Sequence, residues 1–128
     1  HLTLFVDAQN VYKGARDAFF DRRAPSLDGQ IDPMKVARLI VQQQCDSDRP
    51  CVLQEVRVYT GYHTPEKNSK AYSAYQRQSE AWKASGCLVF SRPLRYDPSG
   101  IEPPREKGID VALAIDFVRL ALERVYDL

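Results

Sequence analysis

The sequence predicts an α/β domain in which a parallel sheet carries helices on both faces. Three short, mainly apolar runs, residues 2–6, 52–61 and 87–91, have the length and composition of strands. The segments between and after them repeat apolar residues at helical spacing, which gives the order β-α-α-β-α-β-α. Strands that alternate with helices in this way pair in parallel, because each helix returns the chain to the start of the sheet.

The opening stretch LTLFVDAQN predicts the first strand and the start of the first helix. Leu2 to Val6 are mostly apolar, as expected for a strand buried on both faces. Asp7 follows directly, at the carboxyl end of the strand, where open α/β sheets form their sites. Asn10 is expected to be the N-cap of a helix that begins near Val11.

The second helix has a clear start signal in Asp32 and Pro33. Aspartate is a favoured N-cap residue, and proline is favoured at the first helical position. Apolar side chains then recur on one face of the predicted helix at a spacing of three or four residues. They are Met34, Ala37, Ile40 and Val41.

The second strand, 52–61, is followed by a helix with the same kind of start signal. Thr64 and Pro65 place its beginning, and Gly86 marks its end. One side of the strand is expected to face the core, as is one side of this helix. The strand residues are Val56, Val58 and Thr60, and the helix residues are Ala71, Ala74, Tyr75, Gln78, Ala81 and Trp82.

The third strand, 87–91, leads into a long loop and a last helix. The loop, residues 92–108, holds four of the eight prolines, and loops of this length tend to be functional or disordered. The last helix, 109–125, is apolar over much of its surface, so we expect it to be largely buried. A further strand could begin at residues 126–128, where the sequence stops.

Composition points to a cytoplasmic globular domain without a membrane partner. Hydrophobic residues make up 44% of the chain, and no apolar run approaches the roughly 20 residues needed to span a bilayer. No signal peptide is visible. Cys45, Cys51 and Cys87 are odd in number and lack CxxC spacing, which predicts free thiols in a reducing compartment. His1 and His63 fit no zinc-ligand pattern with them.

Charge is distributed unevenly along the chain. Residues 57–107 carry nine Lys and Arg against five Asp and Glu, a net charge of +4. Residues 1–56 have a net charge of −1, and residues 108–128 have a net charge of −2. A basic middle with acids at both ends suits a polyanionic substrate beside an acidic centre, although solvated surfaces also vary in this way.

Three acids are candidates for such a centre: Asp7, Asp110 and Asp116. A carboxylate that ends a buried strand needs a partner, and a divalent cation is one such partner. Asp110, in the first helical turn, has the simpler role of stabilising the helix terminus. Asp116 lies about 9 Å further along the axis and about 120° around it, on the apolar stripe, where it needs a hydrogen-bond or metal partner. The two helix acids are therefore not expected to share one ion closely; one binds metal and the other orients a water or a ligand.

Two motifs carry a resemblance to a known family. LFVDAQNVY resembles the hydrophobic-Asp-x-x-Asn opening of NYN domains, the ribonuclease-like branch of the PIN-domain nucleases, and EKGIDVALAIDFVRLA is similar to their Lys-Gly-x-Asp-x-x-Leu-x-x-Asp helix. RVYTGYH matches the second strand of these domains. The resemblance covers essentially the whole chain. It implies one PIN-like, Rossmann-like domain over residues 1–128, a three-layer α/β/α sandwich around a central parallel sheet.

The same resemblance implies metal-dependent hydrolysis of RNA with Mg²⁺ or Mn²⁺ as cofactor. It carries over Asp7 and Asp110 as metal-binding acids, Asn10 as the companion of Asp7, and Asp116 as a further catalytic acid. Lys107 matches the lysine before the helix. The family continues into another strand that ends in an acidic Ser-Gly-Asp-Ser-Asp-like motif, so this chain is expected to be truncated before that strand.

RNA is expected to meet cations and an aromatic side chain near the strand ends. Four cations flank or lie on the proline-rich loop and can neutralise phosphates, and one tyrosine lies off the apolar side of its helix and can stack on a base. They are Arg92, Arg95, Arg105, Lys107 and Tyr72. Each is also an ordinary solvated side chain. His63 is a candidate proton donor or, more simply, a turn histidine.

Other functions stay open at this point. One is a catalytically silent RNA- or protein-binding module with the same fold. Another is phosphotransfer, but a haloacid-dehalogenase-like phosphatase needs a second aspartate two positions after the first, where Gln9 stands. A receiver domain needs an acidic pair that Asp7 alone does not supply. A metal-dependent ribonuclease is the leading interpretation, with the RNA class, the direction of cleavage and a homo-oligomer left open.

Overall fold

The computed structural model describes residues 1–45, 48 and 50–127 of the chain. In this part the chain forms a mixed α/β fold with the predicted order β-α-α-β-α-β-α, and each strand lies within two residues of its predicted position. The elements are β1 (Leu2–Asp7), α1 (Ala8–Phe19), α2 (Pro33–Gln44), β2 (Leu53–Tyr62), α3 (Ser69–Ala84), β3 (Leu88–Pro93) and α4 (Ile109–Leu122).

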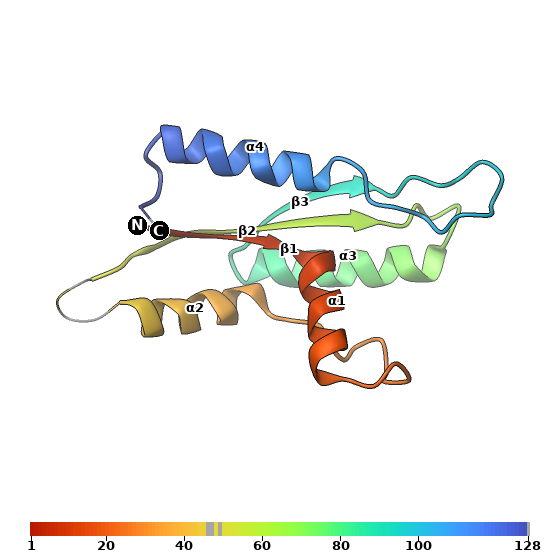
Figure 1. Ribbon diagram of the computed structural model, residues 1–128, viewed down its shortest axis with the longest axis horizontal. Helices are drawn as coiled ribbons and strands as arrows, with labels where there is room; N and C mark the ends of the chain where they lie inside the picture. Colours follow the sequence, from red (N-terminus) through yellow and green to blue (C-terminus); the bar gives the residue numbers. More distant parts are fainter. Residues whose placement is uncertain (46–47, 49, 128) are drawn as a thin grey trace.

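The strands form one parallel sheet, as predicted, and their order in the sheet is β1-β2-β3. Asp7 at the end of β1 lies beside Tyr59 of β2, which lies beside Phe90 of β3. The carboxyl ends of the strands therefore meet at one edge of the sheet. Figure 1 shows α4 on one face of the sheet and α2 and α3 on the other, with α1 turning away from the end of β1.

The face covered by α2 and α3 holds the aliphatic core. Val56 and Val58 of β2 are 1% and 0% exposed, and they pack with Ala37 of α2 and Trp82 of α3. Thr60 on the same side of the strand is also buried. The predicted core side of β2 is thus confirmed, because alternate residues of a strand point to the same face of the sheet.

The face covered by α4 is aromatic. Phe5, Tyr59 and Phe90 form a row across the three strands, with ring centroids 6.5 Å and 5.0 Å apart. Phe117 of α4 and Tyr126, which follows the helix, meet the ring of Phe5 edge-on at 5.3 Å and 5.5 Å. Edge-to-face contacts of this kind are favourable, and they hold α4 and the following residues against the sheet.

The start of α2 confirms the predicted signal. The carboxylate of Asp32 accepts the N–H groups of Met34 and Lys35 at 3.0 Å and 3.2 Å, and Pro33 is the first helical residue. The side chain satisfies two donors that the helix itself leaves free, while proline loses nothing at this position. Both signals are local, so the sequence was sufficient to place them.

The start of α3 differs from the prediction. The helix begins at Ser69 rather than at Thr64 and Pro65, and its N-cap is Asn68, which accepts the N–H of Ala71 at 2.9 Å. Thr64 and Pro65 form a turn before the helix, in which the carbonyl of Thr64 accepts the N–H of Asn68 at 3.0 Å. Proline favours turns as well as helix starts, and Asn68 is an equally good cap, so the sequence offers two starts.

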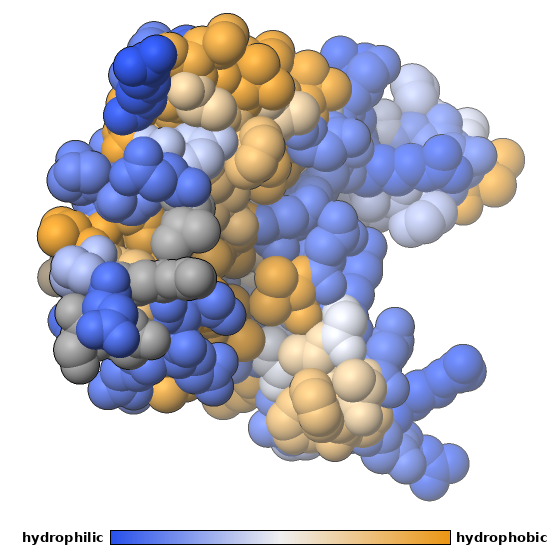
Figure 2. Space-filling model, turned by 60° about the vertical axis from the view of Figure 1, so that its left-hand side comes forward, coloured by the Kyte–Doolittle hydropathy of each residue, from blue (hydrophilic) through white to orange (hydrophobic). Residues whose placement is uncertain are grey.

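The prediction that α4 is largely buried is wrong. The helix ends at Leu122, and its buried residues are Ile109 and Leu120. The exposed fractions are 55% for Val111, 60% for Ile115, 56% for Val118 and 79% for Leu122. Figure 2 shows apolar surface gathered over α4. One side of the helix meets the sheet, and no described residue covers the other.

No helix in the described part of the chain combines the length and apolar character needed to cross a bilayer.

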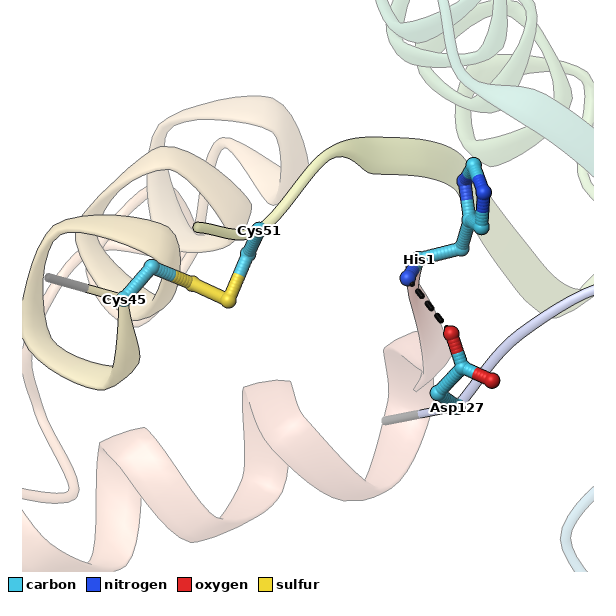
Figure 3. The surroundings of a disulfide bond; sticks show 4 residues. All are labelled: His1, Cys45, Cys51 and Asp127. Atoms are coloured by element: carbon cyan, nitrogen blue, oxygen red, sulfur yellow. Dashed lines mark hydrogen bonds and ion pairs between the residues drawn. A yellow bond between two sulfur atoms is a disulfide. The ribbon is translucent and has the colours of Figure 1, made fainter. Parts of the chain in front are cut away.

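Two of the three cysteines are paired, contrary to the prediction of free thiols. Cys45 and Cys51 form a disulfide (Figure 3). Cys87 is a buried free thiol. The Cα atoms of the pair lie 5.4 Å apart; Cys45 is the C-cap of α2, and Cys51 lies two residues before the start of β2. An odd count without CxxC spacing does not reveal a pair between the end of one helix and the start of the next strand. The cysteines therefore give no support for a reducing compartment.

The two ends of the described chain meet beside the start of β1. The N-terminal ammonium of His1 lies 2.8 Å from the side-chain carboxylate of Asp127 (Figure 3). The backbone N–H of Asp127 donates to the backbone carbonyl of His1 at 2.8 Å. Tyr126 and Asp127 are irregular, so the predicted further strand does not begin in them, and Leu128 lies outside the described residues. The ion pair is exposed and therefore contributes little to stability.

Candidate acidic site

The first acid, Asp7, is held in place by the helix that follows it. Asp7 rather than Asn10 is the N-cap of α1, which begins at Ala8, three residues before the predicted start. One carboxylate oxygen of Asp7 accepts the N–H of Asn10 at 3.0 Å, and the other accepts the Asn10 Nδ2 at 2.8 Å. Asn10 is therefore a helical residue and the direct partner of Asp7. Two contacts fix the orientation of the carboxylate at the carboxyl edge of the sheet.

A second carboxylate, Glu106, was not predicted from the sequence. It lies in the loop before α4 and reaches across to β2, where its Oε1 accepts the N–H of Gly61 at 2.6 Å. A Cβ on Gly61 would lie 2.7 Å from the Glu106 Cγ and 2.7 Å from Leu94, closer than side chains tolerate. The approach therefore needs glycine at this position. The two residues are 45 positions apart, and no spacing in the sequence signals their contact.

The pKa of the Glu106 carboxyl is raised above its usual value by its surroundings. Burial raises the pKa of Glu106, and the hydrogen bond from the Gly61 N–H lowers it. The negative charges of Asp7 and Asp110 also raise the pKa, whereas the positive charge of Lys13 lowers it. Like charges raise a carboxyl pKa only when they lie close by. Burial is the largest of these effects, and the two like charges add to it.

Asp110 occupies the first turn of α4, as predicted. It is exposed and has no hydrogen-bond or ion-pair partner among the described residues. The residue before the helix, Gly108, has a φ of 80° and offers no side chain to cap the helix. Arg92 of β3 lies against it, because a Cβ on Gly108 would be 3.2 Å from the Arg92 guanidinium. The terminus of α4 thus places a free carboxylate, free N–H groups and a guanidinium together.

Glu106→Gln is expected to stabilise the protein at about pH 8 and to have no effect at about pH 3.5. The pKa of Glu106 is higher in the folded than in the unfolded protein, so ionisation of its carboxyl lowers the stability once the pH exceeds the pKa of the unfolded state. Glutamine keeps the acceptor oxygen for the Gly61 N–H and carries no charge. The measurement is the melting temperature of both proteins across this range, with an expected gain of a few degrees. Equal melting temperatures at about pH 8 would contradict the assignment, and Glu102→Gln, on the exposed loop, is the control.

The predicted RNA-binding cations lie around this edge. Arg95 and Arg105 exchange backbone hydrogen bonds of 2.8 Å and 2.9 Å, which close the proline-rich loop, and the side chain of Arg105 pairs with Glu102 at 3.0 Å. The side chains of Arg92, Arg95 and Lys107 have no partner in the part of the chain that the structure describes. Unpaired cations of this kind are available to an anion.

The predicted stacking residue, Tyr72, belongs to a tyrosine cluster. The ring of Tyr62, at the end of β2, stacks on Tyr75 of α3 at 4.7 Å, and Tyr72 lies 5.9 Å from Tyr62. All three rings are half-buried, so Tyr72 packs α3 against the sheet and leaves only part of its surface to solvent. His63 is similarly engaged, with its Nδ1 2.9 Å from the hydroxyl of Tyr96.

Asp116 pairs with side chains of β2 and α4 rather than with the acids at the carboxyl edge of the sheet. One carboxylate oxygen accepts the Tyr59 hydroxyl at 2.8 Å and Arg57 at 3.0 Å, and the other accepts Arg119 at 3.3 Å. Burial alone raises the pKa of Asp116, but these hydrogen bonds outweigh it and lower the pKa below its usual value. Burial raises the pKa of Tyr59 to about 12, so its hydroxyl stays a donor. Asp116 therefore has the hydrogen-bond partner that the sequence required of it.

The carboxylates of Asp7 and Asp110 are oxygen donors of the kind that suits a hard cation. Among the described residues, no three His, Cys, Asp or Glu side chains form a group that could hold a metal ion by themselves. Mg²⁺ binds through one or two carboxylates and keeps several waters, so it does not need three. Asp7 and Asp110 supply two carboxylates at one edge, which is a donor set that fits Mg²⁺ or Mn²⁺.

Comparisons with known proteins place no relative beside this site. No protein-family model matches the chain, no curated protein matches it, and no solved structure matches it. A function for the chain therefore depends on its own residues: two acids at the carboxyl edge of a parallel sheet, a carboxylate bound to the backbone of β2, and cations without a partner among the described residues.

Proposed function

We propose that this chain is a PIN-like domain of the NYN kind that hydrolyses RNA phosphodiester bonds with Mg²⁺ or Mn²⁺. The observation that carries the proposal is the shared edge of the sheet: Asp7 ends β1, and α4 has Asp110 in its first turn, two residues after Gly108, which lies against Arg92 of β3. Helices on both faces of a parallel sheet are also consistent with a three-layer α/β/α sandwich. The motifs around both acids support the same family.

Each residue then has a chemical role. Asp7 and Asp110 hold the ion, and Asn10 keeps both oxygens of Asp7 in a fixed orientation through hydrogen bonds of 3.0 Å and 2.8 Å. When bound, Mg²⁺ or Mn²⁺ lowers the pKa of a water and screens the charge of the scissile phosphate. Because carboxylates hold the ion, no nucleophilic serine or cysteine is needed.

The cations bind the RNA backbone. Arg92 lies against Gly108 at the amino end of α4, where free N–H groups and the helix dipole also favour a phosphate. Lys107 and Arg95 extend this positive surface along the loop. A phosphate bound there would be next to Asp110, close to where the ion is held. The exposed part of Tyr72 is available to stack on a base.

A catalytically silent RNA- or protein-binding module is the second candidate. One observation favours it: no three potential metal ligands in the described residues form a group that could hold an ion. A binding module would use the same cations and would need no acids. The two candidates differ in whether RNA is cut or only bound, and in whether Asp110 matters.

The test is incubation of the chain with labelled single-stranded RNA in Mg²⁺, in Mn²⁺ and in EDTA. We expect cleavage that needs the metal, is lost in Asp110→Asn and is kept in Asp17→Asn, which changes an exposed aspartate of α1 in the same way. RNA that is bound without being cut would favour the binding module. Cleavage that survives in Asp110→Asn would show that the site is assigned wrongly.

A further inference from the structure

The side of α4 that faces away from the sheet has a continuous stripe of aliphatic side chains. Successive members are four, three and four residues apart, and their exposed fractions lie between 55% and 79%. They are Val111, Ile115, Val118 and Leu122. The buried residues of the helix, Ile109 and Leu120, lie on the opposite side, so the stripe takes no part in the core of this chain.

This spacing is typical of the seam between two packed helices. Alternating steps of four and three residues place side chains in a narrow row that fits between the side chains of a second helix. Ala114 and Ala121 flank the row seven residues apart and are exposed, and small side chains at such positions let a second helix approach closely. No charged residue interrupts the row, and apolar surface gathers over α4 in Figure 2.

We propose that a second copy of this chain packs on the stripe, with the two α4 helices antiparallel and related by a two-fold axis. The stripe is complementary to itself in this arrangement. Val111 of one copy meets Leu122 of the other, and Ile115 meets Val118, so each contact joins a larger and a smaller side chain. The antiparallel order also sets the two helix dipoles in opposite directions.

The exposed area is sufficient for such a pair. The exposed fractions of the aliphatic residues and the two alanines correspond to roughly 500 Å² per copy, or about 1,000 Å² in the pair, which reaches the lower limit for a specific interface. Flanking side chains such as Arg119 add to this area. A contiguous apolar patch of this size on a single chain marks an interaction surface.

The charges beside the stripe favour a second copy over a lipid surface. Helices that bind membranes place lysine and arginine side chains beside aromatic ones, where the cations meet anionic headgroups. The cation beside the stripe, Arg119, is already paired with Asp116 and Glu123, and the members of the stripe are all aliphatic. An uncharged aliphatic row is matched best by another of the same kind.

The inference goes beyond the proposed function and does not depend on it. Because α4 has 14 residues, the amino ends of two antiparallel copies lie about 20 Å apart along the pair. The carboxyl edges of the two sheets are therefore at opposite ends of the interface, and both stay open to RNA.

The experiment is sedimentation equilibrium of the chain between about 1 and 200 μM, without RNA or metal. We expect the molar mass to rise from 14.6 kDa towards twice that value as concentration increases. Ile115→Lys and Val118→Glu are each expected to weaken association by about tenfold or more, because each buries an unpaired charge in the interface. Leu27→Lys, which changes a leucine that is 79% exposed on a loop, is the control and is expected to associate as the unchanged chain does.

An equimolar mixture of Ile115→Lys and Val118→Glu tests the antiparallel arrangement. In a mixed pair, one contact joins the new cation to the new anion, and the other keeps isoleucine against valine. We therefore expect the mixture to associate about tenfold or more tightly than either variant alone, and added salt to weaken it. Both positions are more than half exposed, so both variants should fold, and circular dichroism checks this.

Three results would overturn the inference. One is an unchanged chain that stays monomeric at every concentration, including one that binds vesicles of phosphatidylcholine and phosphatidylserine instead. Another is association that neither single variant weakens. The third is a mixture of folded variants that associates no better than its components. Loss of RNA cleavage bears on none of these, so the proposed function and this inference fail separately.

Discussion

Asp7→Asn is expected to abolish metal-dependent RNA cleavage while leaving the fold in place. Asparagine is as good an N-cap as aspartate, so its side-chain oxygen can accept the N–H of Asn10, which Asp7 accepts at 3.0 Å in this structure. The variant loses a negative charge and one of two carboxylate oxygens. We expect the cleavage rate to fall by about a hundredfold or more, beyond the loss typical of an outer-sphere partner. The free energy of unfolding should fall by about 1 kcal/mol or less, because only the strength of the N-cap and the interaction with the helix dipole change.

Asp32→Asn is a matched control for this prediction. Asp32 is the N-cap of α2, where it accepts the N–H groups of Met34 and Lys35. The substitution makes the same chemical change at the same kind of helix position, and it should have a similar effect on the melting temperature. It should leave cleavage unchanged. Equal cleavage by Asp7→Asn and the unchanged chain, or equal losses in both variants, would contradict the assignment of Asp7.

Arg57→Met is expected to cause a large loss of stability. The Arg57 side chain is 8% exposed and lies at 4.5 Å from the centre of the Phe90 ring. It donates to Glu55 at 2.7 Å, to Asp116 at 3.0 Å and to the Tyr59 hydroxyl at 3.1 Å. Burial alone lowers the pKa of Arg57, but these hydrogen bonds outweigh it and raise the pKa.

Removal of this guanidinium leaves two carboxylates without their shared cation. Breaking a buried pair costs roughly 3–5 kcal/mol, and partial hydration of Glu55 and Asp116, at 27% and 20% exposure, reduces this here to about 2–4 kcal/mol. We expect the melting temperature to fall by about 10 °C. Thermal melting followed by circular dichroism is the measurement, with chemical unfolding to give the free energy.

Two further variants test the physical reason for this loss. Arg119→Met removes the exposed partner of Asp116 and should cost less than about 1 kcal/mol. Arg57→Met combined with Asp116→Leu removes one of the two stranded carboxylates and should recover part of the lost stability. If Arg57→Met is no more destabilising than Arg119→Met, the network between the sheet and α4 does not stabilise the fold in this way.

The helix starts illustrate what local sequence can and cannot predict. Asp32 and Pro33 were sufficient for α2 because no rival start lies near them. Before α3, Thr64 and Asn68 are both good caps, and the choice between them depends on the rest of the molecule. The N–H of Thr64 lies 3.3 Å from the hydroxyl of Tyr96, which comes from the loop after β3. A contact across 32 residues is invisible to a local pattern.

The candidate site was predictable in part for the same reason. Asp7 was identified because it ends an apolar strand, and Asp110 because it opens an apolar helix. Glu106 was not identified, because its position depends on the N–H of Gly61 and on the end of β1 beside it. The apolar sequence of α4 predicted burial, yet burial depends on which neighbours are present on each side of the helix.

The sequence by itself determined the order of the elements, the parallel sheet and the placement of an acid at the carboxyl end of β1. These follow from periodicity and from caps, which act over a few residues. The tertiary structure alone decided that Cys45 pairs with Cys51, that Glu106 binds the backbone of Gly61, and that Asp116 pairs with Arg57. Such choices are made by contacts between distant segments, whose energies depend on packing and distance rather than on spacing along the chain.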